Sequence, residues 1–211
     1  MKTTACLLAL LAITALAQAA PAPAPTPLFD GKTFEGWEGD TEKTWRIVDG
    51  AVVGGSLETT VPRNEFLATK KAFTNFDLRL KFKLLGKEGL VNAGVQFRSE
   101  RIPDNFEMIG YQADLGEGYY GSIYDESRRN KILAAADKDV LAKTLKVGEW
   151  NEYPIRCEGP RIQLWINGVQ TVDYTEPDAE IARSGLVALQ IHGGGIAEVS
   201  YKDIMIEELA Q

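Results

Sequence analysis

The chain has 211 residues, with 23 basic against 30 acidic side chains and a formal net charge of −7 at pH 7. Such an acidic surface repels nucleic acid and anionic lipid. Beyond the N-terminal segment no apolar run approaches the roughly 18 residues that a membrane span requires. We therefore expect neither a nucleic-acid partner nor a membrane span.

The first 27 residues have the pattern of an export signal and a linker. Lys2 precedes the apolar run "CLLALLAITAL", and "AQA" closes the segment, which is the order typical of a secretory signal over 1–19. Alternating prolines in "APAPAPTP" predict an extended Pro/Ala linker over 20–27. We expect a periplasmic or secreted protein with one folded domain over 28–211. Once Cys6 is removed with the signal, Cys157 has no disulfide partner and is expected in the core.

Strand patterns dominate the rest of the chain. In "NFDLRLKFKLL" apolar and mostly charged residues alternate, which predicts a half-buried strand over 76–84. "DG" at 49–50 and "NG" at 167–168 each join two apolar runs, as in β-hairpins. Further strand-like runs cover 65–69, 91–99, 107–115, 119–124, 151–158, 186–192 and 196–207, and a short helix is expected over 137–145. So many short strands predict an all-β fold, a two-sheet jelly-roll sandwich.

The segment "YQADLGEGYYGSIYDESRRNK" (111–131) concentrates tyrosines, acids, arginines and glycines without a helical period. We expect two strands joined by a turn, with polar side chains that face a ligand. Sugar hydroxyls, which both donate and accept hydrogen bonds, suit such a surface best. The charged residues Asp125, Glu126, Arg128 and Arg129 form either a solvated cluster or a loop that closes over the ligand.

Three strands share one small pattern, a glutamine followed two residues later by an ionisable residue. The pairs are Gln96 with Arg98, Gln112 with Asp114, and Gln190 with His192. Residues two apart point to the same face of a strand, so six polar groups would gather on one face if the strands share a sheet. Asn92 would extend that face. Each pair alone is better explained by solvated positions on a half-exposed sheet, but the threefold recurrence favours a sugar site.

Other candidate groups are few. His192 is the only histidine, so any histidine that acts as a general base must be this one; the alternative is a structural hydrogen bond beside glycines. Glu38 and Glu42 in "EGDTE" have the spacing of paired glycosidase carboxylates, but the glycines around them favour a solvated loop. The sequence requires no cofactor. A divalent metal is compatible with the Asp/His face, although the spacing does not demand one.

Taken in order, several segments resemble the 3-keto-disaccharide hydrolase family from about residue 28 to 209. These segments are "LFDGKTFEGW", "WRIVDGAVVG", "NAGVQFRSE", "GYQADLGEGYYGSIYDESRR", "WNEYPIRCEGPRIQLWINGVQT" and "GLVALQIHGGGIAEVSYKDIMIEEL". The resemblance implies a jelly roll of the concanavalin-like lectin/glucanase type, export to the periplasm, and action on 3-keto-glycosides made by a partner 3-dehydrogenase. Members are also described as 3-keto-glucoside 1,2-lyases and 3-keto-2-hydroxy-glucal hydratases.

The implied chemistry starts from the ketone at C3, which acidifies the hydrogen on C2. A base removes that hydrogen, the enolate expels the group at C1, and water adds to the double bond. On this hypothesis His192 or Asp114 is the base and Arg98 stabilises the enolate. The expected substrate contacts are Asn92, Gln96, Gln112, Tyr124, Glu126, Arg128 and Gln190.

Two other functions stay open. A non-catalytic carbohydrate-binding module could use the same polar face, and a His192 turned into the core, away from Arg98 and Asp114, would favour it. A two-carboxylate glycosidase would need Glu38 and Glu42 on a strand beside the sugar.

Overall fold

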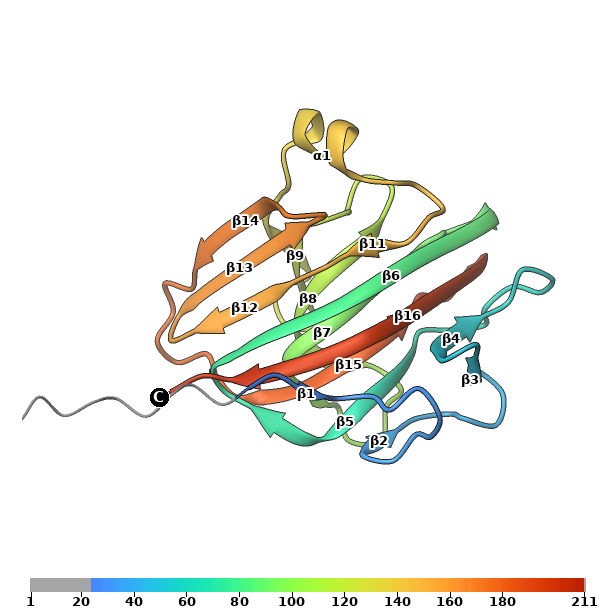
Figure 1. Cartoon of the computed structure of the whole chain (residues 1–211), viewed down its shortest axis with the longest axis horizontal. Helices are drawn as coiled ribbons and strands as arrows, with labels where there is room; N and C mark the ends of the chain where they lie inside the picture. The colour runs from blue at the N-terminus through green and yellow to red at the C-terminus, as the bar shows by residue number, and fades with distance from the viewer. Residues whose placement is uncertain (1–23, 211) are drawn as a thin grey trace, which may run out of the picture.

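The computed structural model describes residues 24–210, which form two antiparallel β-sheets packed against each other (Figure 1). The nine-stranded sheet contains β1 (Thr26–Pro27), β3 (Trp45–Val48), β4 (Ala51–Gly55), β6 (Phe76–Gly89), β11 (Asn151–Glu152), β12 (Ile155–Glu158), β13 (Arg161–Ile166), β14 (Val169–Thr175) and β16 (Gly195–Glu208). The seven-stranded sheet contains β2 (Trp37–Glu38), β5 (Glu65–Phe73), β7 (Asn92–Arg101), β8 (Met108–Gly116), β9 (Ile123–Glu126), β10 (Lys131–Ala134) and β15 (Gly185–Ile191). The expected all-β sandwich is confirmed.

Strands distant in sequence are neighbours in both sheets. The order is β14-β13-β12-β6-β16-β4-β3 in the nine-stranded sheet, where β1 also pairs with β16 and β11 with β6. The order in the other sheet is β10-β9-β8-β7-β15-β5-β2. The long central pair β6 and β16 crosses the front of the view in Figure 1, with β7, β8 and β15 behind it. The segment 1–23, which holds the predicted signal, lies outside the described residues. Thr26 and Pro27, expected in the linker, instead pair with Ile206 and Met205 of β16.

The two predicted hairpins are confirmed, and their turn residues explain them. Asp49 and Gly50 have φ angles of 50° and 75°, and Asn167 and Gly168 have 49° and 81°. A two-residue turn with positive φ at both positions matches the twist of the strands it joins, and Asn, Asp and Gly adopt it at least cost. The turns therefore fix the register of β3 against β4 and of β13 against β14.

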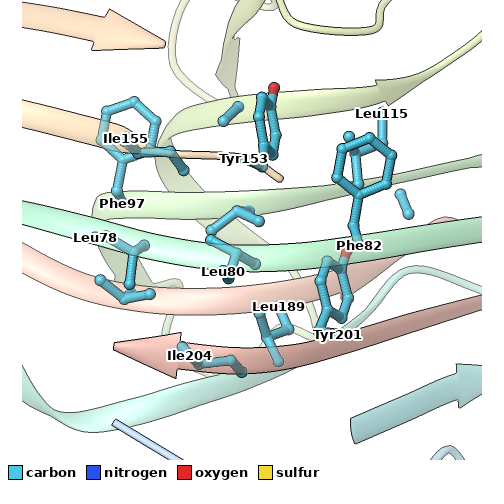
Figure 2. Packing of buried hydrophobic residues seen from close by; sticks show 14 of the residues in the cluster. Leu78, Leu80, Phe82, Phe97, Leu115, Tyr153, Ile155, Leu189, Tyr201 and Ile204 are labelled. Atoms are coloured by element: carbon cyan, nitrogen blue, oxygen red, sulfur yellow. The ribbon is translucent and has the colours of Figure 1, made fainter. Parts of the chain in front are cut away.

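The core lies between the sheets. Along β6 the alternating residues Phe76, Leu78, Leu80, Phe82 and Leu84 are all buried, as the period of two predicts. Figure 2 shows Leu78, Leu80 and Phe82 of β6 among buried residues of the facing strands, such as Phe97 and Leu189. Cys157 is also buried there, as expected. Since alternate residues point inward, Lys81 and Lys83 of β6 must point away from the core.

The predicted short helix is present, whereas one predicted strand is mostly a turn. The helix α1 (Lys138–Thr144) is confirmed, and Asp137 caps it by accepting hydrogen bonds from the backbone N–H groups of Asp139 and Val140. The strand expected over 119–124 is largely wrong, because 119–122 form the turn between β8 and β9. No helix within residues 24–210 has the length and apolarity to cross a bilayer.

Candidate functional site

The three strands that carry the glutamine pairs are neighbours in one sheet. β7 lies between β8 and β15, with Gln96 opposite Gln112 and Gly94 opposite both Asp114 and Gln190. The intervening residues Val95, Ala113 and Ile191 are fully buried in the core between the sheets. The register therefore directs Gln112, Asp114 and Gln190 to the outer face of the seven-stranded sheet, as the period of two predicts.

A polar hollow of about 110 Å³ opens on this outer face. Its lining consists of Leu90, Asn92, Gln112, Asp114, Tyr119, Tyr124, Glu126 and His192. Six of these residues were expected as site residues from the sequence. Leu90 and Tyr119 were not, although Tyr119 stands in the same glycine-rich segment as Tyr124.

Asp114 is the most perturbed group in the polar hollow. Its side chain is 3% exposed, and burial raises the pKa of the carboxyl to about 7, against hydrogen bonds that lower it. Asn92 Nδ2 donates to Asp114 Oδ1 at 3.0 Å, and the backbone N–H of Leu115 donates to the same oxygen at 2.8 Å. Because both bonds end on Oδ1, Oδ2 is the oxygen best able to exchange a proton with a ligand.

Glu126 supplies a second carboxyl to the polar hollow. It lies on β9 two residues after Tyr124, on the same face; Tyr124 pairs with Gln112, and Glu126 pairs with Gly110. Burial raises the pKa of Glu126 to about 7, and the negative charge of Glu107 adds to the shift. Two carboxyls that both titrate near neutral pH, on neighbouring strands, can act as proton donor and proton acceptor in one site.

His192 lies at the end of β15, in the lining of the same hollow. Its backbone N–H donates to the carbonyl of Asn92 at 3.0 Å. Its Nδ1 lies 2.7 Å from the carbonyl oxygen of Gly193. A carbonyl oxygen can only accept, so Nδ1 carries the hydrogen and Nε2 of a neutral ring is free to accept one. His192 is thus not turned into the core, and it keeps a basic nitrogen for the hollow.

Gln96, expected as a substrate contact, does not line the polar hollow but holds Gln112, which does. Gln96 Nε2 donates to Gln112 Oε1 at 3.0 Å, and Ser99 Oγ donates to Gln96 Oε1 at 2.6 Å. Gly94 leaves room for this arrangement, because a Cβ there would lie 2.5 Å from Cδ of Gln112. The amide of Gln112 is therefore held in place by a buried chain of hydrogen bonds.

Gln190 was expected to contact the substrate, but it does not line the polar hollow. It is fully buried, and neither polar atom of its side chain has a hydrogen-bond partner within residues 24–210. It lies on the strand next to Gly94 but is not part of the hollow's lining.

The expectation that Arg98 shares the hollow with Asp114 and His192 is wrong. A bulge interrupts β7 after Phe97, and Arg98 adopts a φ of 48°. Its guanidinium donates to the carbonyl oxygens of Thr74, at 2.7 and 2.9 Å, and of Gly159, at 2.8 Å. The extra residue breaks the period of two, so Arg98 ties the two sheets together at one end of the sandwich.

Arg128 is likewise outside the polar hollow, contrary to its expected substrate contact. It lies 2.7 Å from the carboxylate of Asp125 and 4.6 Å from the ring centre of Tyr111. Asp125 is fully buried and also pairs with Arg129, which lies 2.7 Å from Glu176. Asp125, Arg128 and Arg129 therefore form neither a solvated cluster nor a loop over the ligand, whereas Glu126 of the same run lines the polar hollow. The three make a largely buried ion network with Glu176, which lies far along the chain and gave no sequence signal.

The other candidate groups do not form a site. Glu38 and Glu42 are both exposed, and neither lines the polar hollow. Asp40 accepts hydrogen bonds from the backbone N–H groups of Glu42 and Lys43, which confirms a surface loop. Within residues 24–210 no group of three or more His, Cys, Asp or Glu side chains is placed to hold a metal ion.

Comparison with solved structures shows sandwich folds of the same kind. A candidate glycosyl hydrolase from Parabacteroides distasonis is 22% identical, with 88% of this chain and 94% of that chain covered and a TM-score of 0.65. The carbohydrate-binding module CBM66 from Bacillus subtilis is 14% identical over 82% of this chain and 96% of its own, with a TM-score of 0.62. A Bacillus subtilis protein of unknown function with a galectin-like fold is 8% identical over 90% and 97%, with a TM-score of 0.55. At these identities the likeness establishes the fold alone.

Comparison with protein families is more specific. No curated protein gives a significant match. A family model, however, matches residues 24–207, nearly the whole described chain. The chain therefore belongs to the 3-keto-alpha-glucoside-1,2-lyase-like domain family, as its sequence segments indicated.

Proposed function

We propose that the protein cleaves 3-keto-glycosides in the polar hollow by proton abstraction at C2, loss of the C1 group and addition of water. Family membership supports the substrate class. The observation that carries the mechanism is the buried Asp114 carboxyl with its raised pKa, in one hollow with Glu126 and His192. A partner dehydrogenase that oxidises C3 would supply the substrate, and export directed by residues 1–19 would bring the two together in the periplasm.

Asp114 is the base in this proposal. Its Oδ2 removes the hydrogen from C2, and the electron pair of that C–H bond forms the enolate with the C3 carbonyl. A carboxylate in water is a weak base for this purpose, whereas a buried one with a pKa of about 7 is stronger and is still largely ionised just above neutral pH. Its fixed hydrogen bonds to Asn92 and Leu115 hold the carboxyl in one orientation.

Glu126 is the acid. When the enolate collapses, the C1–O bond breaks and the protonated Glu126 gives its proton to the departing oxygen. In the second stage the Glu126 carboxylate takes a proton from water, the hydroxyl adds to C1, and Asp114 returns its proton to C2. The sum is hydrolysis of the glycosidic bond, and both carboxyls regain their starting states.

The enolate oxygen needs hydrogen-bond donors. No Lys or Arg is among the residues that line the polar hollow. The donors proposed for the enolate oxygen in place of Arg98 are therefore neutral: the hydroxyls of Tyr119 and Tyr124 and the amide of Gln112. Preorganised donors at the developing charge lower the barrier even without a formal cation.

The test is to incubate the purified protein with a glucoside and with its 3-keto form, while following enone absorbance and release of the C1 group. We expect turnover of the 3-keto form only. Asp114→Asn should remove it, and His192→Ala should reduce it less. Glu126→Gln has no acidic proton for the leaving oxygen, so it should lower the rate and remove the fall in rate above pH 7. Asp139→Asn, on the exposed helix, is the matched control. Cleavage of only the unoxidised glucoside would reject the mechanism, and a near-normal rate for Asp114→Asn would reject Asp114 as the base.

Binding of carbohydrate without catalysis is the second candidate. The likeness of the fold to CBM66 favours it. The two candidates differ in one result: a binding module would retain a 3-keto-glucoside in calorimetry and release no product, and Asp114→Asn would then change affinity alone.

A further inference from the structure

A second charged surface lies on the outer face of the nine-stranded sheet. Lys81 and Lys83 point outward from β6, and Lys202 of β16 pairs in register with Lys81. Ser200, the partner of Lys83, is in turn paired with Val53 of β4, and Val53 with Arg46 of β3. These residues and Trp150, which directly precedes β11, therefore form one band across neighbouring strands.

Two cations of this band, Lys83 and Lys202, lie over the ring of Trp150. The ammonium nitrogen of Lys202 lies 4.3 Å from the centre of its ring, and that of Lys83 lies 5.3 Å from it. Cation–π attraction holds both flexible side chains near one place, so less conformational entropy is lost when a ligand contacts them. We call Lys83, Lys146, Lys202 and Trp150 the lysine surface.

Two grooves of about 440 Å³ each meet at Trp150 and Lys202. Lys81, Lys146 and Asn167 line one of them, and Lys83, Arg46 and Ser200 line the other. Because the grooves share two residues, they form a continuous track that suits a linear polymer better than a flat membrane.

The charges in the track are only partly balanced. Arg46 pairs with Glu198 at 2.5 Å, and Lys81 pairs with Asp203 at 3.0 Å. Lys83, Lys146 and Lys202 form no salt bridge within residues 24–210. Lys83 and Lys202 lie over the Trp150 ring, and Lys146 lines one groove with it. In a chain with a net charge of −7, these three cations outnumber Glu152 and Asp49, the acids of the two linings that form no salt bridge within residues 24–210, and leave a local positive charge that attracts anions.

We propose that the lysine surface binds an acidic polysaccharide, a chain of sugars with carboxylate or sulfate groups. The lysines would contact the anionic groups, and Ser200, Asn167 and Glu152 offer hydrogen-bonding groups for hydroxyls along the track. The site lies on the opposite outer face of the sandwich from the polar hollow. It would hold the protein on a glycan while the hollow stays open.

The test is affinity electrophoresis and calorimetry with polygalacturonate, with neutral dextran and phosphatidylglycerol vesicles as comparison ligands. We expect binding to polygalacturonate alone, weakened by salt. The triple variant Lys83→Gln, Lys146→Gln, Lys202→Gln should bind about tenfold or more weakly. The triple variant Lys32→Gln, Lys43→Gln, Lys70→Gln, which makes the same charge change elsewhere, should bind like the wild type.

Three results would overturn the proposal: no retardation by polygalacturonate, equal losses in both triple variants, or binding to the vesicles without binding to polygalacturonate. A third variant with Arg at the three positions keeps the charge and should restore binding, which separates loss of charge from loss of fold. Because the readout is binding, failure here is distinct from failure of the proposed 3-keto chemistry, whose readout is turnover.

Discussion

Asp114 and Glu176 are buried carboxyls of nearly equal exposure, 3% and 7%, that behave in opposite ways. Burial raises the pKa of Asp114 to about 7. Burial also acts to raise the pKa of Glu176, but hydrogen bonds from Arg129 and Tyr111 outweigh it and lower the pKa to about 2. The difference lies in the neighbours: Glu176 has a guanidinium at 2.7 Å and a phenol at 2.7 Å, whereas the residues around Asp114 in the hollow carry no fixed cation.

The two carboxyls have different roles: the neighbours of Glu176 suit a structural ion pair, and those of Asp114 suit proton transfer. A buried carboxylate with an arginine partner stays ionised and ties strands together, as Glu176 does with Arg129. A buried carboxyl without such a partner makes folding less favourable when it ionises, and such a group is a candidate for proton transfer. Carboxyls of both kinds lie on the hairpin of β8 and β9. Its outer face carries Asp114 and Glu126, which have no arginine partner, and its inner face carries Asp125, which pairs with Arg128 and Arg129.

The largest expected effect is the loss of turnover in Asp114→Asn. The amide keeps an oxygen to accept the bonds from Asn92 and Leu115, but it cannot remove a proton. We expect turnover of a 3-keto-glucoside to fall by about 10³ to 10⁴-fold, or about 4 to 5.5 kcal/mol. Steady-state kinetics on the folded variant measures it, and a fall of less than tenfold would remove Asp114 from the chemistry.

The structural side of the comparison is tested by Arg129→Ala. Removing the guanidinium leaves Glu176 and Asp125 buried with one cation fewer, so the free energy of unfolding should fall by about 3 to 5 kcal/mol. Arg161→Ala is the control, because Arg161 pairs with Asp173 on the surface at 2.5 Å, and exposed pairs contribute about 1 kcal/mol or less. Urea unfolding of both variants gives the values; equal losses would contradict a special role for the buried network.

Stability should also depend on pH through Asp114. Its pKa in the folded state is about 7, above the usual value of 3.8, so the folded state binds the proton more tightly than the unfolded chain. The free energy of unfolding should therefore fall as pH rises from about 4 to about 7. Asp114→Asn removes the part of that fall that Asp114 causes, and the part caused by Glu126, whose pKa is also raised to about 7, stays. The variant should be the more stable protein above pH 7 by about 1 to 4 kcal/mol. Urea unfolding at pH 4.5 and pH 8 measures the difference, and a constant gap between the two proteins would refute the assignment.

The smallest expected effect comes from Gly94→Ala. The added Cβ would push Gln112 out of its place in the lining of the hollow, so we expect turnover to fall about tenfold and stability by about 1 kcal/mol. Gly54→Ala meets Trp45 at 2.5 Å in the other sheet, so it should lose stability without losing turnover. An unchanged rate in Gly94→Ala would mean that Gln112 does not position the substrate.

Local sequence patterns predicted those parts of the molecule that local physics determines. The alternation from Phe76 to Leu84 and the turns at Asp49–Gly50 and Asn167–Gly168 depend only on side-chain direction and positive φ, and all three are confirmed. The recurrence of Gln112 with Asp114 and Gln190 with His192 brought two of three pairs to one face. The family was predicted from the order of similar segments along residues 28–209, and the family model confirms it over 24–207.

The remaining features depend on contacts that the sequence does not contain locally. The bulge after Phe97 adds one residue to β7 and turns Arg98 toward carbonyls of Thr74 and Gly159. After β9, Arg128 pairs with Asp125, and Arg129 pairs with both Asp125 and Glu176, which is 47 residues from Arg129. Without the sheet order, neither the carbonyls around Arg98 nor the Glu176 carboxylate could be identified as partners, so Arg98 was expected beside the ligand and Arg129 was left between a solvated cluster and a loop over the ligand.

The role of Asp114 as the base is tested most directly by a ¹³C NMR titration of the side-chain carboxyls, with Asp114→Asn and Glu176→Gln to assign the two signals. The midpoint should lie near pH 7 for Asp114 and, in the same sample, near pH 2 for Glu176 as long as the fold persists. A midpoint near pH 4 for Asp114 would contradict that role, since the carboxyl would then be an ordinary solvated acid and not a base held ready in the hollow.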